Sequence, residues 1–435
     1  MARPKKNAPK PATQELSLVP VEEQPYPLPE GWKWVRGKSL FKPQKTQKPF
    51  GTEFKYIDID AINNKNQTVQ NVKLVPTVKA PIRASRFIQV GDTLFSLVRP
   101  YLKNIAYVDN SLSDAIASTG FYVCSPQLNS NPRYIFHMMT SSYVVDGLNQ
   151  FMKGDNSPSI RKGDIENFLF PLPTLDVQQR IVDRIESLFA KLDEAKDKAQ
   201  AALDSFETRK AAILHRAFTG ELTAKWREER GIPCSSWKED TIDSLCRSLK
   251  YGTAKKSKDS GAVVVLRMGN LQGGEISWDN LAYSDDNEDI QKYHLAAGDV
   301  LFNRTNSAEL VGKTSIYRGE LPAIYAGYLI KMDYKKDCLT GPYLNYVMNS
   351  QKAKAYCNFV KSDGVNQSNI NAKKLGAFII PVPSLPEQQE ITRILDSLLK
   401  KEQQSKAAAE AVLAQIDLMK KAILAKAFRG ELSYI

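Results

Sequence analysis

The chain has 435 residues, of which 42% are hydrophobic and 25% charged, and these ordinary globular values allow real cores to form. Its formal charge of +12 indicates an anionic partner. No apolar run approaches the roughly 18–20 residues that a membrane helix needs, and no apolar signal segment stands near the N-terminus, so we expect neither a membrane protein nor a secreted one.

Cysteine and histidine usage points the same way. The five cysteines are scattered and lack any C-x-x-C pair, and none of the three histidines, His137, His215 and His294, is paired at metal-ligand spacing. The cysteines are Cys124, Cys234, Cys246, Cys338 and Cys357. We therefore expect a reduced, cytoplasmic protein without structural zinc.

The positive charge is unevenly spread along the chain. Residues 1–170 carry 22 Lys+Arg against 14 Asp+Glu, residues 171–230 carry 11 of each, and residues 231–380 carry 19 against 16. Four of the first group, Arg3, Lys5, Lys6 and Lys10, lie in a Pro-rich segment that we interpret as a disordered basic arm over residues 1–27. The remaining excess of positive charge lies before and after residues 171–230. It predicts that an anionic partner binds those flanking parts of the chain and not residues 171–230.

Short strands dominate the segment after the arm. FKYIDID and DTLFSLV have strand character, as does AVVVLRM near residue 263, and one or two helices follow each group of strands. An apolar, helix-like stretch opens at Pro132, and another opens at Pro342. This pattern indicates mixed α/β domains, without settling the strand order.

A long helix is predicted after Pro171. Thr174 is an N-cap candidate and Gly220 suits a C-terminal stop. Between them, apolar residues alternate in steps of four and three, which is a heptad seam. Its members are Ile181, Ile185, Leu188, Leu192, Ala195, Ala199, Ala202 and Phe206. About 43 residues at roughly 1.5 Å each predict a rod near 60 Å long.

The same segment recurs 210 residues later, starting at Pro381. Ser384 and Glu387 have capping-box spacing and Gly430 is the matching stop. The second seam keeps Ile391, Leu395, Leu398, Ala409, Val412, Ile416 and Ile423, with an interruption at Glu402 and Ser405. A repeat of this kind indicates a tandem duplication. Because neither helix can hide its apolar stripe alone, we expect the two to pair; the alternative is that each packs on its own domain.

These residues resemble the DNA-specificity subunits of type I restriction–modification systems. The resemblance rests on the P-L-P-x-L-x-x-Q-Q-R-I entry at Pro171–Ile181, echoed at Pro381–Ile391, and on the K-x-A-I-L-x-x-A-F-x-G-E-L exit at Lys210–Leu222 and Lys420–Leu432. The G-D-x-L-F segment at Gly91–Phe95 and again at Gly298–Phe302 adds a weaker signal. Together the matches cover nearly everything after about residue 28.

The resemblance implies an α+β fold with two mixed α/β target-recognition domains separated by two long antiparallel helices that form a coiled-coil spacer. The corresponding boundaries are a basic arm over 1–27, target-recognition domains over 28–172 and 231–382, and helical spacer repeats over 173–230 and 383–435. It further implies that the chain binds double-stranded DNA with a split target and that methyltransferase subunits bind to the helical repeats. A restriction/translocase subunit is implied as a third partner in the complex. S-adenosylmethionine, ATP and Mg²⁺ are expected in those partner subunits and not in this chain.

No motif predicts chemistry in the chain itself. Asn131–Tyr134 is similar to the N-P-P-[FY] loop of adenine methyltransferases, but Arg133 replaces the second proline. Val311–Thr314 resembles the end of a phosphate-binding loop, but Ser307 stands where that loop requires glycine. Asp58 and Asp60 would share one face of a strand, with no third group for a nuclease metal site. We expect a non-catalytic subunit.

Two loops in each globular segment carry side chains suited to reading DNA, which needs Lys or Arg for phosphates and Arg, Asn, Gln, Ser or Thr for base edges. They are Val98–Asn104 and Lys153–Arg161 in the first segment, and Asn303–Ser307 and Lys361–Asn369 in the second. The candidate contact residues are Arg99, Tyr101, Lys103, Lys153, Asn156, Ser159, Arg161, Arg304, Thr305, Asn306, Lys313, Lys361, Asn366, Gln367 and Asn369. The competing interpretation is that these are ordinary polar turns.

Two other classes of protein stay open at this point. A single-chain DNA-modifying enzyme would need cofactor and metal motifs, and the sequence shows none. A coiled-coil scaffold with incidental basic charge would not need neutral helices flanked by paired polar loops. A gel-shift titration against competitor DNA separates the scaffold from the DNA-binding subunit, and a methylation assay on the isolated chain tests the enzyme.

Overall fold

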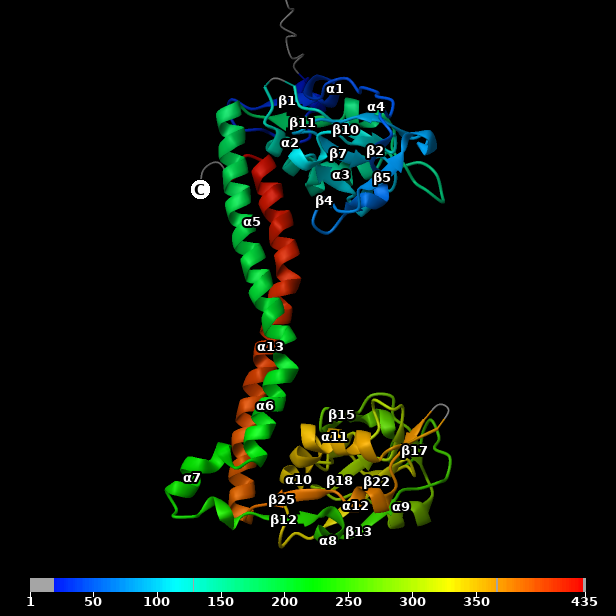
Figure 1. The fold of residues 1–435 in the computed structure, drawn as a ribbon, viewed down its shortest axis with the longest axis vertical. Helices are drawn as coiled ribbons and strands as arrows, with labels where there is room; N and C mark the ends of the chain where they lie inside the picture. Colours follow the sequence, from blue (N-terminus) through cyan, green and yellow to red (C-terminus); the bar gives the residue numbers. More distant parts are fainter. Residues whose placement is uncertain (1–18, 128, 365–366, 433–435) are drawn as a thin grey trace, which may run out of the picture. The chain divides into compact units, whose positions relative to one another are not determined.

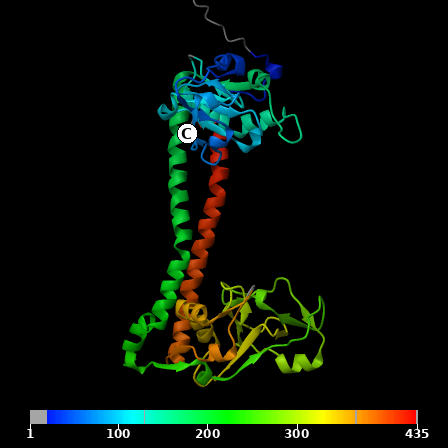
Figure 2. The ribbon, with the colours of Figure 1, turned by 45° about the vertical axis from the view of Figure 1, so that its right-hand side comes forward.

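The protein is described here by a computed structural model that covers residues 19–127, 129–364 and 367–432. The chain divides into two compact units, the first combining Met1–Ala199 with Ala411–Ile435 and the second spanning Gln200–Glu410. Each unit holds one globular domain, the beginning of the long helix that follows it, and the end of the other long helix (Figures 1 and 2).

The first unit contains small sheets and short helices. Its sheets have the strand orders β1–β11, β10–β7–β8, β5–β2–β9–β6 and β3–β4. The strands are β1 Lys33–Arg36, β2 Glu53–Ile57, β3 Ile62–Asn63, β4 Thr68–Val69, β5 Lys73–Pro76, β6 Ala84–Phe87, β7 Thr93–Ser96, β8 Ile105–Tyr107, β9 Ile116–Ser118, β10 Phe121–Cys124 and β11 Leu169–Leu172. The helices of the domain are α1 Gly37–Leu40, α2 Pro132–Thr140, α3 Ser142–Asn149 and α4 Lys162–Asn167.

The second unit is built in the same way around a larger sheet. Its sheets have the orders β13–β22–β18–β20–β16–β15, β17–β14–β21, β19–β24–β23 and β12–β25. The strands are β12 Lys238–Thr241, β13 Cys246–Tyr251, β14 Val263–Leu266, β15 Leu271–Gln272, β16 Glu275–Ile276, β17 Tyr283–Ser284, β18 Val300–Asn303, β19 Thr305–Asn306, β20 Thr314–Ile316, β21 Ala323–Tyr325, β22 Leu329–Tyr334, β23 Ser362–Asp363, β24 Ser368–Asn369 and β25 Ile379–Val382. Its short helices are α7 Ala224–Glu228, α8 Ile242–Leu245, α9 Asn287–Tyr293, α10 Gly341–Met348, α11 Gln351–Val360 and α12 Ala372–Gly376.

The repeated G-D-x-L-F segment leads into β7 in the first domain and β18 in the second, and each of these strands lies between two others in its sheet. In β7, Leu94 packs into one apolar cluster and Phe95 into another, because successive side chains of a strand point to opposite faces. In β18, Leu301 and Phe302 divide in the same manner. Both faces are therefore buried, which explains the continuous apolar run. The turn before each strand needs its glycine, since Gly91 has a φ of +94° and Gly298 a φ of +93°.

A repeated glutamine joins each domain to the long helix that follows it. Gln178 accepts the backbone N–H of Asn131 at 2.7 Å and donates to the Pro173 carbonyl at 2.8 Å. Gln388 accepts the backbone N–H of Thr340 at 2.9 Å and donates to the Pro383 carbonyl at 3.0 Å. Both amide groups are buried, so each side chain satisfies backbone groups that water cannot reach.

The long helices are α5 Leu175–Asp204, α6 Phe206–Phe218 and α13 Leu385–Phe428. The first copy, predicted as one long helix, is divided at Ser205, although the Ser205 N–H still donates to the Ala201 carbonyl at 3.1 Å and the Arg209 N–H to the Ser205 carbonyl at 3.0 Å. The Ser205 hydroxyl donates to the Ala201 carbonyl at 2.7 Å, a bond that competes with the backbone ladder. The glycine stops were predicted correctly: Gly220 and Gly430 have φ of +82° and +80°.

The helices pair antiparallel within each unit. In the first unit, Ile181 and Ile185 share an apolar cluster with Leu424 and Phe428. Further along α5, Asp193 lies 2.5 Å from Lys420. In the second unit, Lys406 lies 4.8 Å from the ring of Phe206, and Arg209 Nε donates to Glu402 at 2.8 Å. Moving along the first helix toward its C-terminus, the contacted residues of α13 have successively lower numbers, which is the antiparallel arrangement that Figure 1 shows for α5 and α13.

Two details of the predicted helices were wrong. The carboxylate of Glu387 does not serve as a capping-box partner, since its oxygens accept from Thr223, Arg227 and Trp237. Val412, assigned to the second seam, is 39% exposed. The expected start was right, because the Thr174 and Ser384 carbonyls accept the first intrahelical bonds.

Residues 19–27 were assigned to a disordered arm, and the structure instead places them against the first domain. Tyr26 donates its hydroxyl to the Phe428 carbonyl at 3.0 Å, and Trp34 donates its indole N–H to the Tyr26 carbonyl at 3.1 Å. The basic residues of the arm, Arg3 to Lys10, lie outside the described residues. The described part of this segment therefore covers the end of α13.

Candidate nucleic-acid interface

The two loops predicted in the first unit come together. Val98 and Ser159 form a β-bridge, and the backbone N–H of Ile160 donates to the Leu97 carbonyl at 2.9 Å. Arg99 adds two bonds, from its backbone N–H to the Pro158 carbonyl at 2.8 Å and from Nη2 to the Asn156 carbonyl at 2.7 Å. Loops that are far apart in sequence thus form one polar surface.

The first of these loops has an unusual backbone. Arg99 and Lys103 both have positive φ, +48° and +54°, on either side of a 3₁₀ turn at Pro100–Leu102. Residues with a Cβ adopt this conformation at a cost, which the surrounding contacts offset. Tyr101 is exposed at the tip of the loop, whereas Lys103 is half-buried. Burial, together with the charge of Lys421, lowers the pKa of Lys103.

The second unit repeats the arrangement with different side chains. The backbone N–H of Ile370 donates to the Arg304 carbonyl at 2.9 Å, and Thr305 pairs with Asn369 across β19 and β24. Arg304 therefore occupies the position of Leu97, and Asn306 occupies the position of Arg99. The structure thus aligns the two loops residue by residue, which the sequence alone did not do.

Arg304 is the best-positioned cation of the second unit. Its guanidinium carbon lies 4.8 Å from the centre of the Tyr251 ring, and its Nη2 donates to Asn369 Oδ1 at 3.3 Å. Within the described residues, its buried Nε makes no hydrogen bond. The aromatic ring and the amide hold the guanidinium in place, while its remaining Nη N–H groups can donate hydrogen bonds to a ligand.

Arg304 lines a cleft of about 1010 Å³ that we call the second-unit cleft. Its other cations and aromatic group come from loops that the sequence reasoning missed. They are Lys255, Lys256, Arg267 and Tyr328, beside the amides of Asn270, Gln272 and Asn280. Only the number of cations between strands could have indicated them, since they belong to no motif.

An acidic loop fixes one wall of the second-unit cleft. Lys255 lies 2.6 Å from Asp286, and this hydrogen bond raises the pKa of Lys255. Lys258 lies 3.3 Å from Asp285. Because these carboxylates neutralise their partners, Lys256, Arg267 and Arg304 carry most of the attraction that the cleft offers to a phosphate.

A two-residue turn lies beside the loops in both units, at Thr119–Gly120 in the first and at Gly327–Tyr328 in the second. In the first, Leu97 donates to the Gly120 carbonyl at 2.8 Å and Thr119 to the Arg83 carbonyl at 2.8 Å. In the second, Arg304 donates to the Tyr328 carbonyl at 3.0 Å, and Gly327 to the Thr253 carbonyl at 2.7 Å. Arg83 thus lies next to the loop surface of the first unit. Thr253 has the equivalent position in the second unit, where it leads into the cleft.

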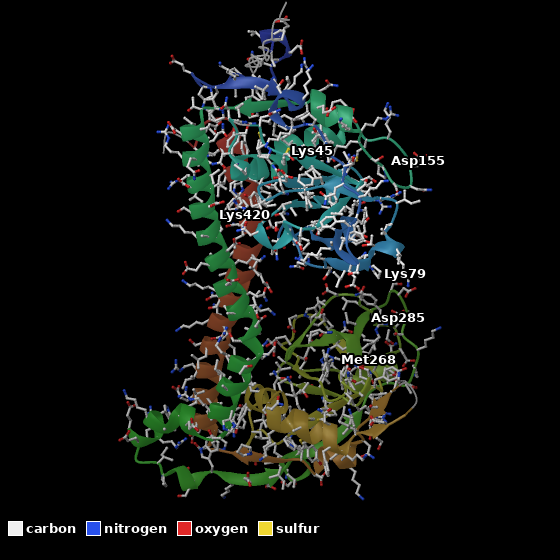
Figure 3. All side chains as sticks on the ribbon, turned by 45° about the horizontal axis from the view of Figure 1, so that its top comes forward. Lys45, Lys79, Asp155, Met268, Asp285 and Lys420 are labelled. Carbon is white, nitrogen blue, oxygen red and sulfur yellow. The ribbon has the colours of Figure 1, made fainter. Side chains whose placement is uncertain are left out.

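The remaining candidates are spread around these loops. Lys153, Asn156 and Arg161 are exposed, and Ser159 is half-buried in its bridge. Figure 3 shows Asp155, in the same loop, at the outer edge of the domain. In the second unit, Lys313 donates to Gln272 at 3.1 Å and Lys361 to the Ala308 carbonyl at 3.0 Å. Gln367 is exposed, and Asn366 lies outside the described residues. The assignment of DNA contacts to these residues stays a prediction.

The motifs that resembled catalytic sequences have structural roles. Asn131 caps α2 and accepts from the backbone of Arg133 and Tyr134, while Tyr134 is buried and donates to the Pro171 carbonyl at 2.9 Å. Lys313 precedes a strand, β20, and not the helix that a phosphate-binding loop requires.

The acidic pair was assigned to a strand, and this was wrong. Asp58 caps a 3₁₀ turn over Ile59–Ala61, accepts the backbone N–H of Asp60, and pairs with Lys73 at 2.9 Å. Across the described residues, no group of three or more His, Cys, Asp or Glu side chains could hold a metal ion. Within the same residues, no helix has the length and apolar character of a membrane span.

Comparison with known proteins gives a consistent result. Residues 29–203 and 235–412 match a family model described as the type I restriction modification DNA specificity domain. The EcoKI specificity subunit of Escherichia coli (strain K12) is 27% identical over 306 residues, which is 69% of this chain and 65% of that protein. The StySPI specificity subunit of Salmonella potsdam is 23% identical over 423 residues, covering 93% and 90%.

Solved structures are similar over almost the whole chain. The crystal structure of the HsdS subunit from Thermoanaerobacter tengcongensis has a TM-score of 0.72 and 26% sequence identity, and the match covers 94% of this chain and 99% of that one. A second solved chain, from a structure that concerns complex assembly and conformational transition of the type I R-M system, has the same TM-score and sequence identity.

Proposed function

The chain belongs to the type I restriction–modification DNA specificity family, and from this premise we propose that it reads a split DNA target with its two globular domains. Family membership also makes it a non-catalytic specificity subunit. Each unit would read one half of the target through its pair of loops. The paired helices would set the separation between the two halves.

One observation carries this proposal: the same loop geometry recurs with different side chains. Val98 bridges Ser159 in the first unit where Thr305 pairs with Asn369 in the second. At the next position Arg99 corresponds to Asn306. Arginine matches guanine and asparagine matches adenine through bidentate hydrogen bonds in the major groove. Two domains with the same loop backbone and different side chains at the contact positions are what two different half-sites require.

We further propose that the long helices bind the other subunits of the complex. Within the first unit, α13 keeps Leu418 and Met419 exposed, at 64% and 47%. Apolar side chains on a helix face suit a methyltransferase subunit, and a restriction/translocase subunit would join through the assembled complex. S-adenosylmethionine, ATP and Mg²⁺ would then be bound by those partners, and the complex would act in the cytoplasm, where its DNA lies.

Selection from a random-sequence duplex library tests the DNA-reading role. The full chain, with methyltransferase subunits added if they raise affinity, should enrich two short conserved blocks at a fixed separation. Arg99→Ala should relax the consensus in one block only. The matched control is Lys198→Gln, which removes an exposed cation on α5 that pairs with Glu194 and should leave both blocks intact. Recovery of one contiguous block, or of none, would contradict the proposal.

A further inference from the structure

The chain between Asp60 and Asp92 has a composition that the candidate loops do not share. It contains five cations, Lys65, Lys73, Lys79, Arg83 and Arg86, and no acidic residue. At the offset of 207 that relates the two G-D-x-L-F strands, the segment of the second domain is residues 268–298, which contains six acidic residues and one cation. Residues 31–52 also carry six cations and no acidic residue, so the positive excess of the first domain lies in both stretches; the stretch between Asp60 and Asp92 we call the basic segment.

Two large apolar side chains of the basic segment are almost completely exposed. Val78 is 95% exposed and Ile82 is 100% exposed. Leu74 and Phe50, which flank the same region, are each 64% exposed. An isolated exposed apolar residue needs no explanation, but a group of this kind marks a contact surface.

The backbone that presents Val78 and Ile82 is fixed. A 3₁₀ turn at Thr77–Lys79 begins after Pro76, and the Thr77 N–H donates to the Thr52 carbonyl at 2.9 Å. Pro81 follows, and its carbonyl accepts the Ala84 N–H at 2.9 Å. The two prolines remove backbone freedom, so little entropy is lost when these tips enter a partner.

The basic segment is continuous with the candidate interface of the first unit. Thr119 donates to the Arg83 carbonyl, and the neighbouring Gly120 carbonyl accepts from Leu97, which precedes the Val98–Asn104 loop. Figure 3 shows Lys79 at the margin of the first domain. A duplex bound at the loop would therefore have the basic segment beside it.

The charges decide between DNA and protein as the partner. Protein–protein interfaces are depleted of lysine, whereas proteins that kink DNA place apolar wedges between base steps and flank them with Lys and Arg. We propose that Val78 and Ile82 are such a wedge. They enter the minor groove next to the half-site read by the first domain, while Lys79 and Arg83 contact the adjacent phosphates. This inference rests on the proposed function, since it assumes that the loop of the first unit binds DNA.

DNA bending by the full chain tests the wedge. The probe is a duplex of about 60 base pairs obtained from the library selection, labelled at its ends with a donor and an acceptor dye. Wedge insertion kinks DNA by about 20–90°, so the wild-type chain should raise energy transfer between the ends. The Val78→Ser/Ile82→Ser variant should bind within about tenfold of wild type but lose most of this rise.

A control variant and a second readout keep the test decisive. Val21 is also apolar and 80% exposed, but it lies outside the basic segment, so Val21→Ser should bend the duplex like wild type. All three substituted side chains are exposed, so the melting temperatures should not change. Unaltered bending by the double variant, or no bending by wild type, would overturn the wedge. Loss of methyltransferase-subunit binding with bending intact would assign the surface to protein and also overturn it.

Failure of the wedge and failure of the proposed function give different results. If the selection returns two blocks and the wild-type chain leaves the duplex straight, the chain reads a split target without inserting Val78 and Ile82. If the selection returns no conserved block, the reading role itself fails, whatever the bending experiment shows.

Discussion

Arg227 and Glu387 form a buried ion pair in the second unit, with Nη1 and Oε1 2.6 Å apart and side chains only 6% and 1% exposed. The carboxylate also accepts from Thr223 at 2.7 Å and from the Trp237 indole at 3.0 Å. These bonds join the segment after α6 to the first turn of α13. In the first copy of the repeat the equivalent position is Val177, so the ion pair belongs to the second unit alone.

Glu387→Val, which copies the first repeat, should destabilise the second unit by about 3–5 kcal/mol, because it leaves a buried guanidinium without its carboxylate. Urea unfolding followed by tryptophan fluorescence measures the change, and Trp237 makes the signal sensitive to this site. The control is Arg227→Met/Glu387→Val. Replacement of both charges by apolar groups should recover most of the loss, and a double variant as unstable as the single one would contradict this account.

Glu402 makes a similar ion pair with a different expected consequence. Its partner Arg209 is 36% exposed and Glu402 is 22% exposed, so water screens the charges. Glu402→Gln should therefore change the free energy of unfolding by less than about 1 kcal/mol. The same urea titration measures it. A loss as large as that for Glu387 would mean that the pair is protected from solvent, contrary to its exposure.

His137 should make the first unit sensitive to mild acid. It is buried against α5, with Nε2 3.3 Å from Glu186, and burial together with the charge of Arg133 lowers its pKa from 6.5 to about 4. The unfolded chain binds a proton near pH 6.5 and the folded chain only near pH 4. The stabilisation is therefore present in full above pH 6.5 and is lost as the pH falls toward 4, by on the order of 3 kcal/mol.

Thermal unfolding between pH 7.5 and 4 checks the His137 prediction. His137→Gln keeps a polar side chain of similar reach and cannot be protonated, so the stability of this variant should depend less on pH in that window. The exposed His215 on α6 provides the control, and His215→Gln should keep the wild-type profile. Equal pH dependence in wild type and His137→Gln would exclude His137 as the cause.

Much of the helical architecture could be predicted, because a heptad seam is a local and repetitive signal. Ile181, Ile185, Ile391 and Leu395 are all at most 1% exposed, as the periodicity indicated. The break at Ser205 could not be predicted, since serine is tolerated in helices and its bond to Ala201 depends on the local geometry. The role of Glu387 was also hidden, because its partners Thr223, Arg227 and Trp237 lie 150 or more residues away.

The candidate site was predictable only in part. Polar composition singled out the two loops, but it gave no indication that they pair through Leu97 and Ile160, and the assignment of DNA contacts to them stays a prediction. The residue-level correspondence was not visible, because the offset between the copies is 210 in the helices but 207 at the G-D-x-L-F strand. The second-unit cleft was missed because Lys256 and Arg267 come from turns between strands whose order no sequence pattern settles.

Arg304→Ala should weaken binding to the selected target more than binding to random DNA. The guanidinium lies against Tyr251 and Asn369, so under the proposed function it would approach the duplex in one orientation, and removal of such a base contact would cost about 1–3 kcal/mol. Lys256 lines the same cleft, and we expect it to contact phosphate only. Lys256→Gln should therefore weaken both DNAs alike and reduce the salt slope by about one. Competition titrations at several salt concentrations separate the two outcomes, and equal losses on both DNAs for Arg304→Ala would remove Arg304 from the reading role.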